Sequence, residues 1–305
     1  MVQIFTDTAA NLPMKLLEEY GIRTVPLSYE VDGVEPDYSI EFNGPAFYEA
    51  MRRGASVKTS MVNPEQAARA IEESLQAGMD VLYLGISGGI SGSCWGVGVQ
   101  CRELEEKYGS GRIAVLDTRG ASLGEGLVVV ETARLAKEGR SLGELKDFAK
   151  SRCARMQQFF VVDDLKYLHK GGRISGGARL AGTLLQVKPI LRGNEEGKIV
   201  VYDKVRGKKK ALEALAEIYD KTVDDRGTPI GIAHADAPAD ALHLQNLLRD
   251  RGAEGRSPMC AMSRLPAPMW ARGRWPCSST AKRGDKKRAK SPLLFSALMS
   301  RGKRI

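Results

Sequence analysis

Three segments of the chain combine residue types that can hold an anion. They are residues 56–60 (SVKTS), 87–93 (SGGISGS, here the Gly/Ser loop) and 170–177 (KGGRISGG). The Gly/Ser loop follows an apolar run typical of a buried strand and precedes a helical pattern, so its N–H groups and the helix dipole favour a small carboxylate or phosphate. The hydroxyls of Ser91 and Ser93 are further donors. The competing interpretation is a tight turn that needs its glycines only for their backbone angles.

The other two segments are also predicted to be loops, 56–60 between two helices, and they give weaker signals on their own. Arg173 lies between glycines, where its guanidinium could donate two parallel hydrogen bonds to a phosphate or carboxylate. A solvated arginine in an exposed turn explains the same pattern. Lys58 and Thr59 by themselves indicate no function. The Gly/Ser loop has neither the spacing G-x-x-x-x-G-K-[ST] nor that of G-x-G-x-x-G, so a nucleotide site is not indicated.

Residues for nucleophilic or metal-assisted catalysis are scarce. The three histidines, His169, His234 and His243, have no serine or cysteine partner in a recognisable motif. His234 ends a predicted strand, where α/β sites gather, but a structural histidine is the favoured interpretation. The five cysteines form no C-x-x-C pair, which favours free thiols in a reducing cytoplasm over metal ligation. We therefore expect no catalytic group, no metal and no cofactor.

Alternating strand and helix patterns must position these segments. Apolar runs predict strands at residues 2–5, 22–31, 80–87, 112–118, 158–164 and 229–234. Periodicity predicts helices at 11–20, 45–53, 64–77, 123–137, 142–152, 208–223 and 239–251, with a hairpin turn at 194–197. Asn63 before Pro64 and the capping box Ser141-x-x-Glu144 predict where two of these helices begin. This pattern predicts an α/β protein of two domains: a three-layer parallel-sheet domain over residues 1–154 and an α+β domain over residues 155–254.

Net charge divides the chain into two unequal parts. The 305 residues carry a formal charge of +9, yet residues 255–305 hold 13 Lys/Arg against one acid. The first 254 residues hold 33 basic and 36 acidic side chains, so we expect the excess to belong to a disordered basic tail. Nucleic-acid binding through this tail ranks last among the functions considered, because charge alone is no recognisable module. No apolar run approaches the ~18 residues of a membrane helix, and the first residues do not form a signal peptide.

Nine motifs in one order resemble the DegV family of bacterial fatty-acid-binding proteins. The matching segments, from residue 2 to about 252, are 6–8 (TDT), 25–27 (VPL), 56–60, 85–92 (GISGGISG), 117–118 with 122–126, 168–175, 188–191 (KPIL), 204–207 (KVRG) and 231–236 (GIAHAD). Each motif alone is weak, whereas their common order and spacing are specific.

This resemblance implies a lipid carrier without a catalytic group of its own. One long-chain fatty acid would lie in an apolar tunnel between two domains, its carboxylate held by the hydroxyls of Thr59 and Ser91, with Gly92 and Ser93 completing the loop. Arg173 would belong to the headgroup site and to the partner surface. The implied partner is a separate ATP-dependent fatty acid kinase subunit in the cytoplasm, without stable membrane insertion. The alternative is an enzyme that handles a small phosphorylated molecule at the same Gly/Ser loop.

The resemblance ends where the family continues with a strand and a G-x-H-x-G-P-G segment, whose histidine joins the headgroup site. Codons for residues 269–282 (MWARGRWPCSSTAK) can be read from the last base of the Pro268 codon as H-V-G-P-G-A-V-A-L-F-L-Y-G-E. Met and Trp have single codons, which fixes much of this reading. We therefore hypothesise that the segment from about Gly255 onward is translated in the wrong frame; a genuine basic extension is the rival explanation.

The nucleotide sequence of the gene tests the frameshift hypothesis directly. We expect a single inserted or deleted base whose correction restores the H-V-G-P-G ending. The repaired protein should be more soluble, retain more lipid and melt at a higher temperature, because it regains a strand and a polar partner for the ligand. The hypothesis is wrong if no single-base change restores that ending, and an unchanged melting temperature after repair counts against it.

Overall fold

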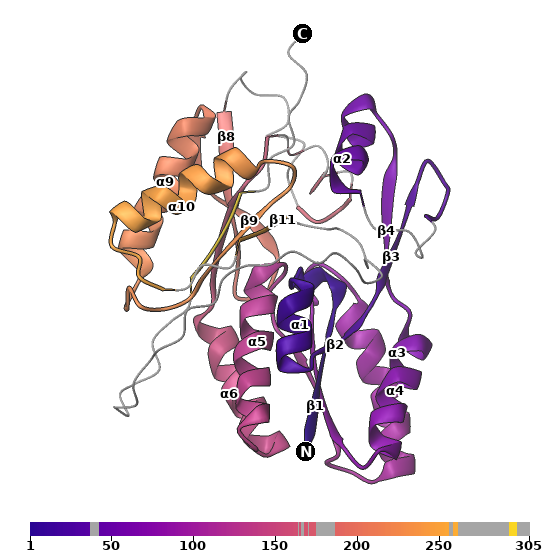
Figure 1. Ribbon diagram of the computed structural model, residues 1–305. Coiled ribbons are helices and arrows are strands. Elements are labelled where there is room, and N and C mark those ends of the chain that lie inside the picture. Colours follow the sequence, from indigo (N-terminus) through magenta and orange to yellow (C-terminus); the bar gives the residue numbers. More distant parts are fainter. Residues whose placement is uncertain are drawn as a thin grey trace.

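The chain builds two α/β units, each around its own sheet (Figure 1). The computed structural model describes residues 1–36, 43–163, 165, 168–169, 171–174, 187–255, 259–261 and 293–297, the last two ranges as backbone only. In Figure 1 the N-terminal unit lies below and the second unit above it, with a two-stranded ribbon rising beside them. The α/β fold predicted from the sequence is confirmed.

The N-terminal sheet is entirely parallel. Its strands are β1 (Val2–Asp7), β2 (Arg23–Val25), β5 (Asp80–Gly85) and β6 (Ile113–Asp117), in the order β2-β1-β5-β6. Neighbouring side chains of β5 point to opposite faces, so Val81 and Tyr83 pack with one layer of helices while Leu82 and Leu84 pack with the other. Burial on both faces explains the continuous apolar run in β5.

Helices cover both faces of this sheet. They are α3 (Pro64–Gln76) and α4 (Ser93–Tyr108) on one face, and α1 (Met14–Tyr20), α5 (Leu123–Lys137) and α6 (Leu142–Arg155) on the other, with a short 3-10 turn at Thr8–Ala10. Two predicted helix starts are confirmed: Asn63 caps α3 ahead of Pro64, and Ser141 with Glu144 forms a reciprocal capping box on α6. None of the helices in the described ranges is long and apolar enough to cross a membrane.

The ribbon contains the segment 56–60 that the sequence predicts as a loop. Strand β3 (Leu27–Val31) pairs antiparallel with β4 (Val57–Val62), and α2 (Gly44–Arg53) lies between them in the chain. The loop prediction is therefore wrong, because β4 becomes a strand only through its pairing with β3 and carries no apolar run of its own. The predicted strand 22–31 is broken at Pro26, which has no N–H to donate, into β2 of the main sheet and β3 of the ribbon.

The second unit is a mixed six-stranded sheet in the order β11-β10-β12-β7-β8-β9. Its strands are β7 (Gln157–Val161), β8 (Val187–Gly193), β9 (Ile199–Arg206), β10 (Ile230–His234), β11 (Met259–Ala261) and β12 (Leu293–Ala297). Strands β11, β10, β12 and β7 run parallel, whereas β7, β8 and β9 are antiparallel. Helices α9 (Lys208–Thr222) and α10 (Pro238–Asp250) pack on one face around Tyr219 and Ile232. The domain limits of 154 and 254 stay a prediction.

Two strands lie in the range expected to be a disordered tail. Strand β11 extends the edge beside β10, and β12 fills the centre of the sheet between β10 and β7. The expectation is wrong for these two segments, because a central gap would leave the backbone groups of both β10 and β7 unpaired. Residues 262–292 and 298–305, including the back-translated segment 269–282, lie outside the described residues.

Candidate functional site

The Gly/Ser loop leaves the carboxyl end of β5 and satisfies most of its own N–H groups. The N–H groups of Ile90 and Ser91 donate to the Ser87 carbonyl, both at 3.0 Å, and that of Gly89 donates to Ser87 Oγ at 3.1 Å. The N–H of Gly88 donates to Asp117 Oδ2 at 3.0 Å. The sequence predicts that the N–H groups of this loop are available to an anion, and that prediction is wrong for these four groups. The N–H groups in the first turn of α4 still have no intrahelical acceptor.

Ser91 and Ser93 form the polar end of the loop. Their hydroxyl oxygens lie 2.8 Å apart, and the N–H of Ser93 also donates to Ser91 Oγ at 3.3 Å. Ser93 is fully buried and its Oγ accepts from the N–H of Val62 at 3.1 Å. Ser91 is half-buried. The structure thus places Ser91 at the surface of the site and Ser93 behind it.

Thr59 lies on strand β4, whose last residue, Val62, bonds to Ser93. Thr59 is exposed, pairs with Tyr29 of β3, and precedes Val62 by three residues. Met61 covers the beginning of α4: a Cβ added to Gly96 would lie 2.9 Å from Met61 Cε. A larger residue at position 96 would have to displace the end of the Met61 side chain.

Arg173 reaches the loop from the second unit. Its Nε donates to the Ile90 carbonyl at 3.2 Å and its Nη1 donates to the Gly171 carbonyl at 2.5 Å. The guanidinium therefore lies beside the residue that precedes Ser91, with further N–H groups that have no partner among the described residues. Lys170 and residues 175–177 of the same motif lie outside those residues.

The turn between β8 and β9 docks onto the Gly/Ser loop. Ser87 Oγ donates to the Gly197 carbonyl at 2.8 Å, and Arg119 Nη1 donates to the Glu195 carbonyl at 3.0 Å. Gly197 has a φ of +73°, and a Cβ there would lie 2.0 Å from Ser87 Oγ. No side chain fits at position 197, because the turn of the second unit lies directly against the loop. Both units therefore contribute to the structure around the loop.

Two buried carboxyl groups that the sequence did not assign to the site lie beneath the loop. Asp7 Oδ2 accepts from the N–H of Ile86 at 2.9 Å and from the Tyr83 hydroxyl at 3.2 Å, which anchors the start of the loop. Glu125 accepts from the Thr6 hydroxyl at 2.8 Å, while its Oε2 has no partner among the described residues. An acid inside the apolar pattern of α5 is the signal that could have revealed Glu125.

Burial changes the ionisation of this pair. Desolvation raises the pKa of Asp7 to about 6 and, together with the negative charge of Asp7, raises the pKa of Glu125 well above its ordinary value. The thiols of Cys94 and Cys101 are also buried, which raises the pKa of each to about 12 and leaves them without reactive thiolate at neutral pH. No group of three or more His, Cys, Asp or Glu within the described ranges could hold a metal ion.

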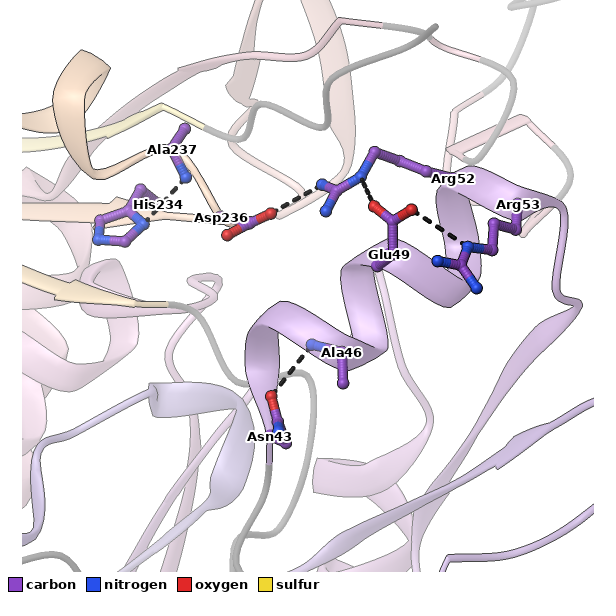
Figure 2. A network of polar contacts seen from close by, with 8 residues as sticks. All are labelled: Asn43, Ala46, Glu49, Arg52, Arg53, His234, Asp236 and Ala237. Carbon is purple, nitrogen blue, oxygen red and sulfur yellow. Dashed lines mark hydrogen bonds and ion pairs between the residues drawn. The ribbon is translucent and has the colours of Figure 1, made fainter.

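His234 lies near a contact between α2 and the second unit (Figure 2). Its Nδ1 accepts from the N–H of Ala237 at 3.3 Å, as the structural interpretation predicts, and burial lowers its pKa. Nearby, Arg52 of α2 forms an ion pair with Asp236 at 2.7 Å. Figure 2 shows this pair bridging α2 to the loop after β10, next to the bond between Arg52 and Glu49. The pair fixes α2 against the second unit.

Comparisons with known proteins point to one family. The model of the DegV family, described as uncharacterised proteins, matches residues 1–265. A DegV domain-containing protein of Clostridium perfringens is 35% identical over 251 residues, which are 81% of this chain and 86% of that protein. The crystal structure of a fatty-acid-binding DegV family protein from Streptococcus agalactiae has a TM-score of 0.76 at 31% identity, over 86% of this chain and 92% of that one. A DegV family protein from Thermus thermophilus, described by its fatty acid binding, has a TM-score of 0.71 at 30% identity, over 85% and 92%.

The raised pKa of Asp7 predicts a pH-dependent stability. Its pKa is about 6 in the folded protein and about 4 in an unfolded chain, so its contribution to stability is greatest below about pH 4 and is lost as the pH rises through about 6. Asp7→Asn is neutral at every pH. Urea unfolding should therefore show the free energy of unfolding of the variant, relative to the wild type, increasing from about pH 4 to about pH 7. Exposed Asp147→Asn is the control, and a difference for Asp7→Asn that does not change with pH would contradict the prediction.

Proposed function

Because the chain belongs to the DegV family, we propose that it binds a long-chain fatty acid and holds the carboxylate at the Gly/Ser loop. The two solved relatives above, at 31% and 30% identity, are described as fatty-acid-binding, and each is matched over 92% of its length. The proposal assigns the carboxylate to Ser91, Thr59 and Arg173, with Gly92 and Ser93 completing the loop.

The observation that carries this proposal is the hydrogen bonding of Ser91. Its Oγ lies within bonding distance of the N–H and the hydroxyl of Ser93. With those two bonds accepted, the Ser91 hydroxyl has its own proton to donate outward, as a carboxylate requires. The Arg173 guanidinium beside Ile90 adds positive charge at the same place. A carboxylate removed from water needs such partners to offset its desolvation.

The acyl chain supplies most of the affinity in this proposal. Burying some 15 methylenes at ~0.8 kcal/mol each gives an upper bound of about 12 kcal/mol before ordering costs are subtracted. Residues of both units surround the Gly/Ser loop, which supports a path for the chain between them. The headgroup contacts then set orientation and selectivity for the acid.

The alternative, an enzyme for a small phosphorylated molecule, is less well supported. Four N–H groups of the Gly/Ser loop, which a phosphate cradle would use, are already bonded within the protein. Hydroxyls and one guanidinium suit a singly charged carboxylate better than a dianion.

Lipid analysis of the purified protein tests the binding proposal. Mass spectrometry of a solvent extract should find a long-chain fatty acid at about one per chain, and Ser91→Ala should lower the affinity for palmitate about tenfold, because a hydrogen bond to a charged group is lost. Ser110→Ala, at the opposite end of α4, is the matched control. An empty protein with its own phosphatase or ATPase activity would establish the alternative.

We further propose that the bound carboxylate is presented in the cytoplasm to an ATP-binding fatty acid kinase subunit. Arg173 is exposed beside the site, which supports a role at the partner surface. Mixed with such a subunit, ATP and palmitate, the protein should yield acyl phosphate. Arg173→Ala should reduce turnover more than palmitate affinity, whereas Arg140→Ala, just before the start of α6, should change neither. Equal turnover of the Arg173 variant and wild type would contradict this role.

A further inference from the structure

We propose that Ser93 is a positioning residue: it does not touch the ligand but fixes the Ser91 hydroxyl so that its proton points toward the bound carboxylate. This inference rests on the proposed function, since it concerns the same headgroup site. From the sequence Ser93 is a ligand-binding residue alongside Ser91. The structure separates the two roles through burial and hydrogen bonding.

The first step is the environment of Ser93. Its side chain is fully buried, and its Oγ accepts from the N–H of Val62 at 3.1 Å. The remaining hydroxyl proton needs an acceptor, and among the described residues that acceptor is Ser91 Oγ at 2.8 Å. A buried hydroxyl proton without an acceptor costs about 1–3 kcal/mol. Ser93 therefore donates to Ser91, and the reverse direction would leave the Ser93 proton unpaired.

The second step is the consequence for Ser91. A serine hydroxyl has two acceptor lone pairs and one proton. Ser91 Oγ receives the hydroxyl of Ser93 at 2.8 Å and the N–H of Ser93 at 3.3 Å, which uses both lone pairs. Only its proton remains, and Ser91 is half-buried, so the proton is available to a ligand. Accepting two bonds also polarises the hydroxyl and strengthens the bond that it donates.

The third step is the connection to β4. The N–H that orients Ser93 belongs to Val62, the last residue of the strand that carries Thr59. The register of β3 and β4 shifts between Leu27 and Tyr29, so β4 has an extra residue between Thr59 and Val62. The bond from Val62 to Ser93 therefore ties the strand of one proposed carboxylate donor, Thr59, to the orientation of the other, Ser91.

The experiment compares two probes that differ only in the headgroup, palmitic acid and hexadecan-1-ol. The ratio of their affinities reports the carboxylate contacts and cancels burial of the chain. We expect Ser91→Ala and Ser93→Ala each to reduce this ratio about tenfold, and the double variant to reduce it no further than Ser91→Ala alone. Ser93→Cys, of similar size and with a weak donor, is the second variant should the alanine variant fold poorly, and it should also lower the ratio.

The outcomes separate this inference from the proposed function. An additive loss in the double variant would show that Ser93 binds the carboxylate itself, which overturns the positioning role. Loss in Ser91→Ala with an unchanged ratio in both Ser93 variants would overturn it as well, while leaving the proposed function intact. Equal affinity of the wild-type protein for acid and alcohol would instead contradict the proposed carboxylate site.

Discussion

A single buried serine, Ser87, organises the site. Its N–H donates to the Gly120 carbonyl, its carbonyl accepts two N–H groups of the loop, and its hydroxyl accepts from Gly89 and donates to Gly197. A buried polar network is stable only when each of its polar groups has a hydrogen-bond partner. Every polar group of Ser87 has one, and these partners are backbone groups of both units. The rest of the loop, including the direction in which Ser91 faces, depends on this arrangement.

The same network determines which anions suit the proposed site. Because most of the loop N–H groups are bonded inside the protein, the donors left for a ligand are hydroxyls, the first turn of α4 and the guanidinium of Arg173. The carboxyl of Asp7 lies directly beneath the loop, where it accepts a hydrogen bond from the N–H of Ile86, the residue before Ser87. Burial raises the pKa of Asp7 to about 6, so protonation below that pH removes a negative charge that would oppose an anionic ligand.

The two units are held together by short polar contacts in addition to apolar packing. The Arg52–Asp236 ion pair joins α2 to the second unit, and the turn at Gly197 joins that unit to the loop. Strand β12 completes the second sheet with residues from the basic C-terminal segment. This placement gives the backbone groups of β10 and β7 hydrogen-bond partners. The frameshift hypothesis is tested by the nucleotide sequence of the gene.

Local patterns in the sequence determined the α/β class, most helices and strands, and the capping of α3 and α6, because these depend on periodicity and on residues within one turn. They also singled out Ser91, Ser93 and Arg173, since glycine- and serine-rich turns are local features. They could not predict β4 or β12, whose strand character comes from partners distant in the chain. Nor could they show that most N–H groups of the loop are already bonded within the protein, or that Ser93 lies behind Ser91. Those facts depend on burial and on bonds between residues up to 110 positions apart, and only the tertiary structure decides them.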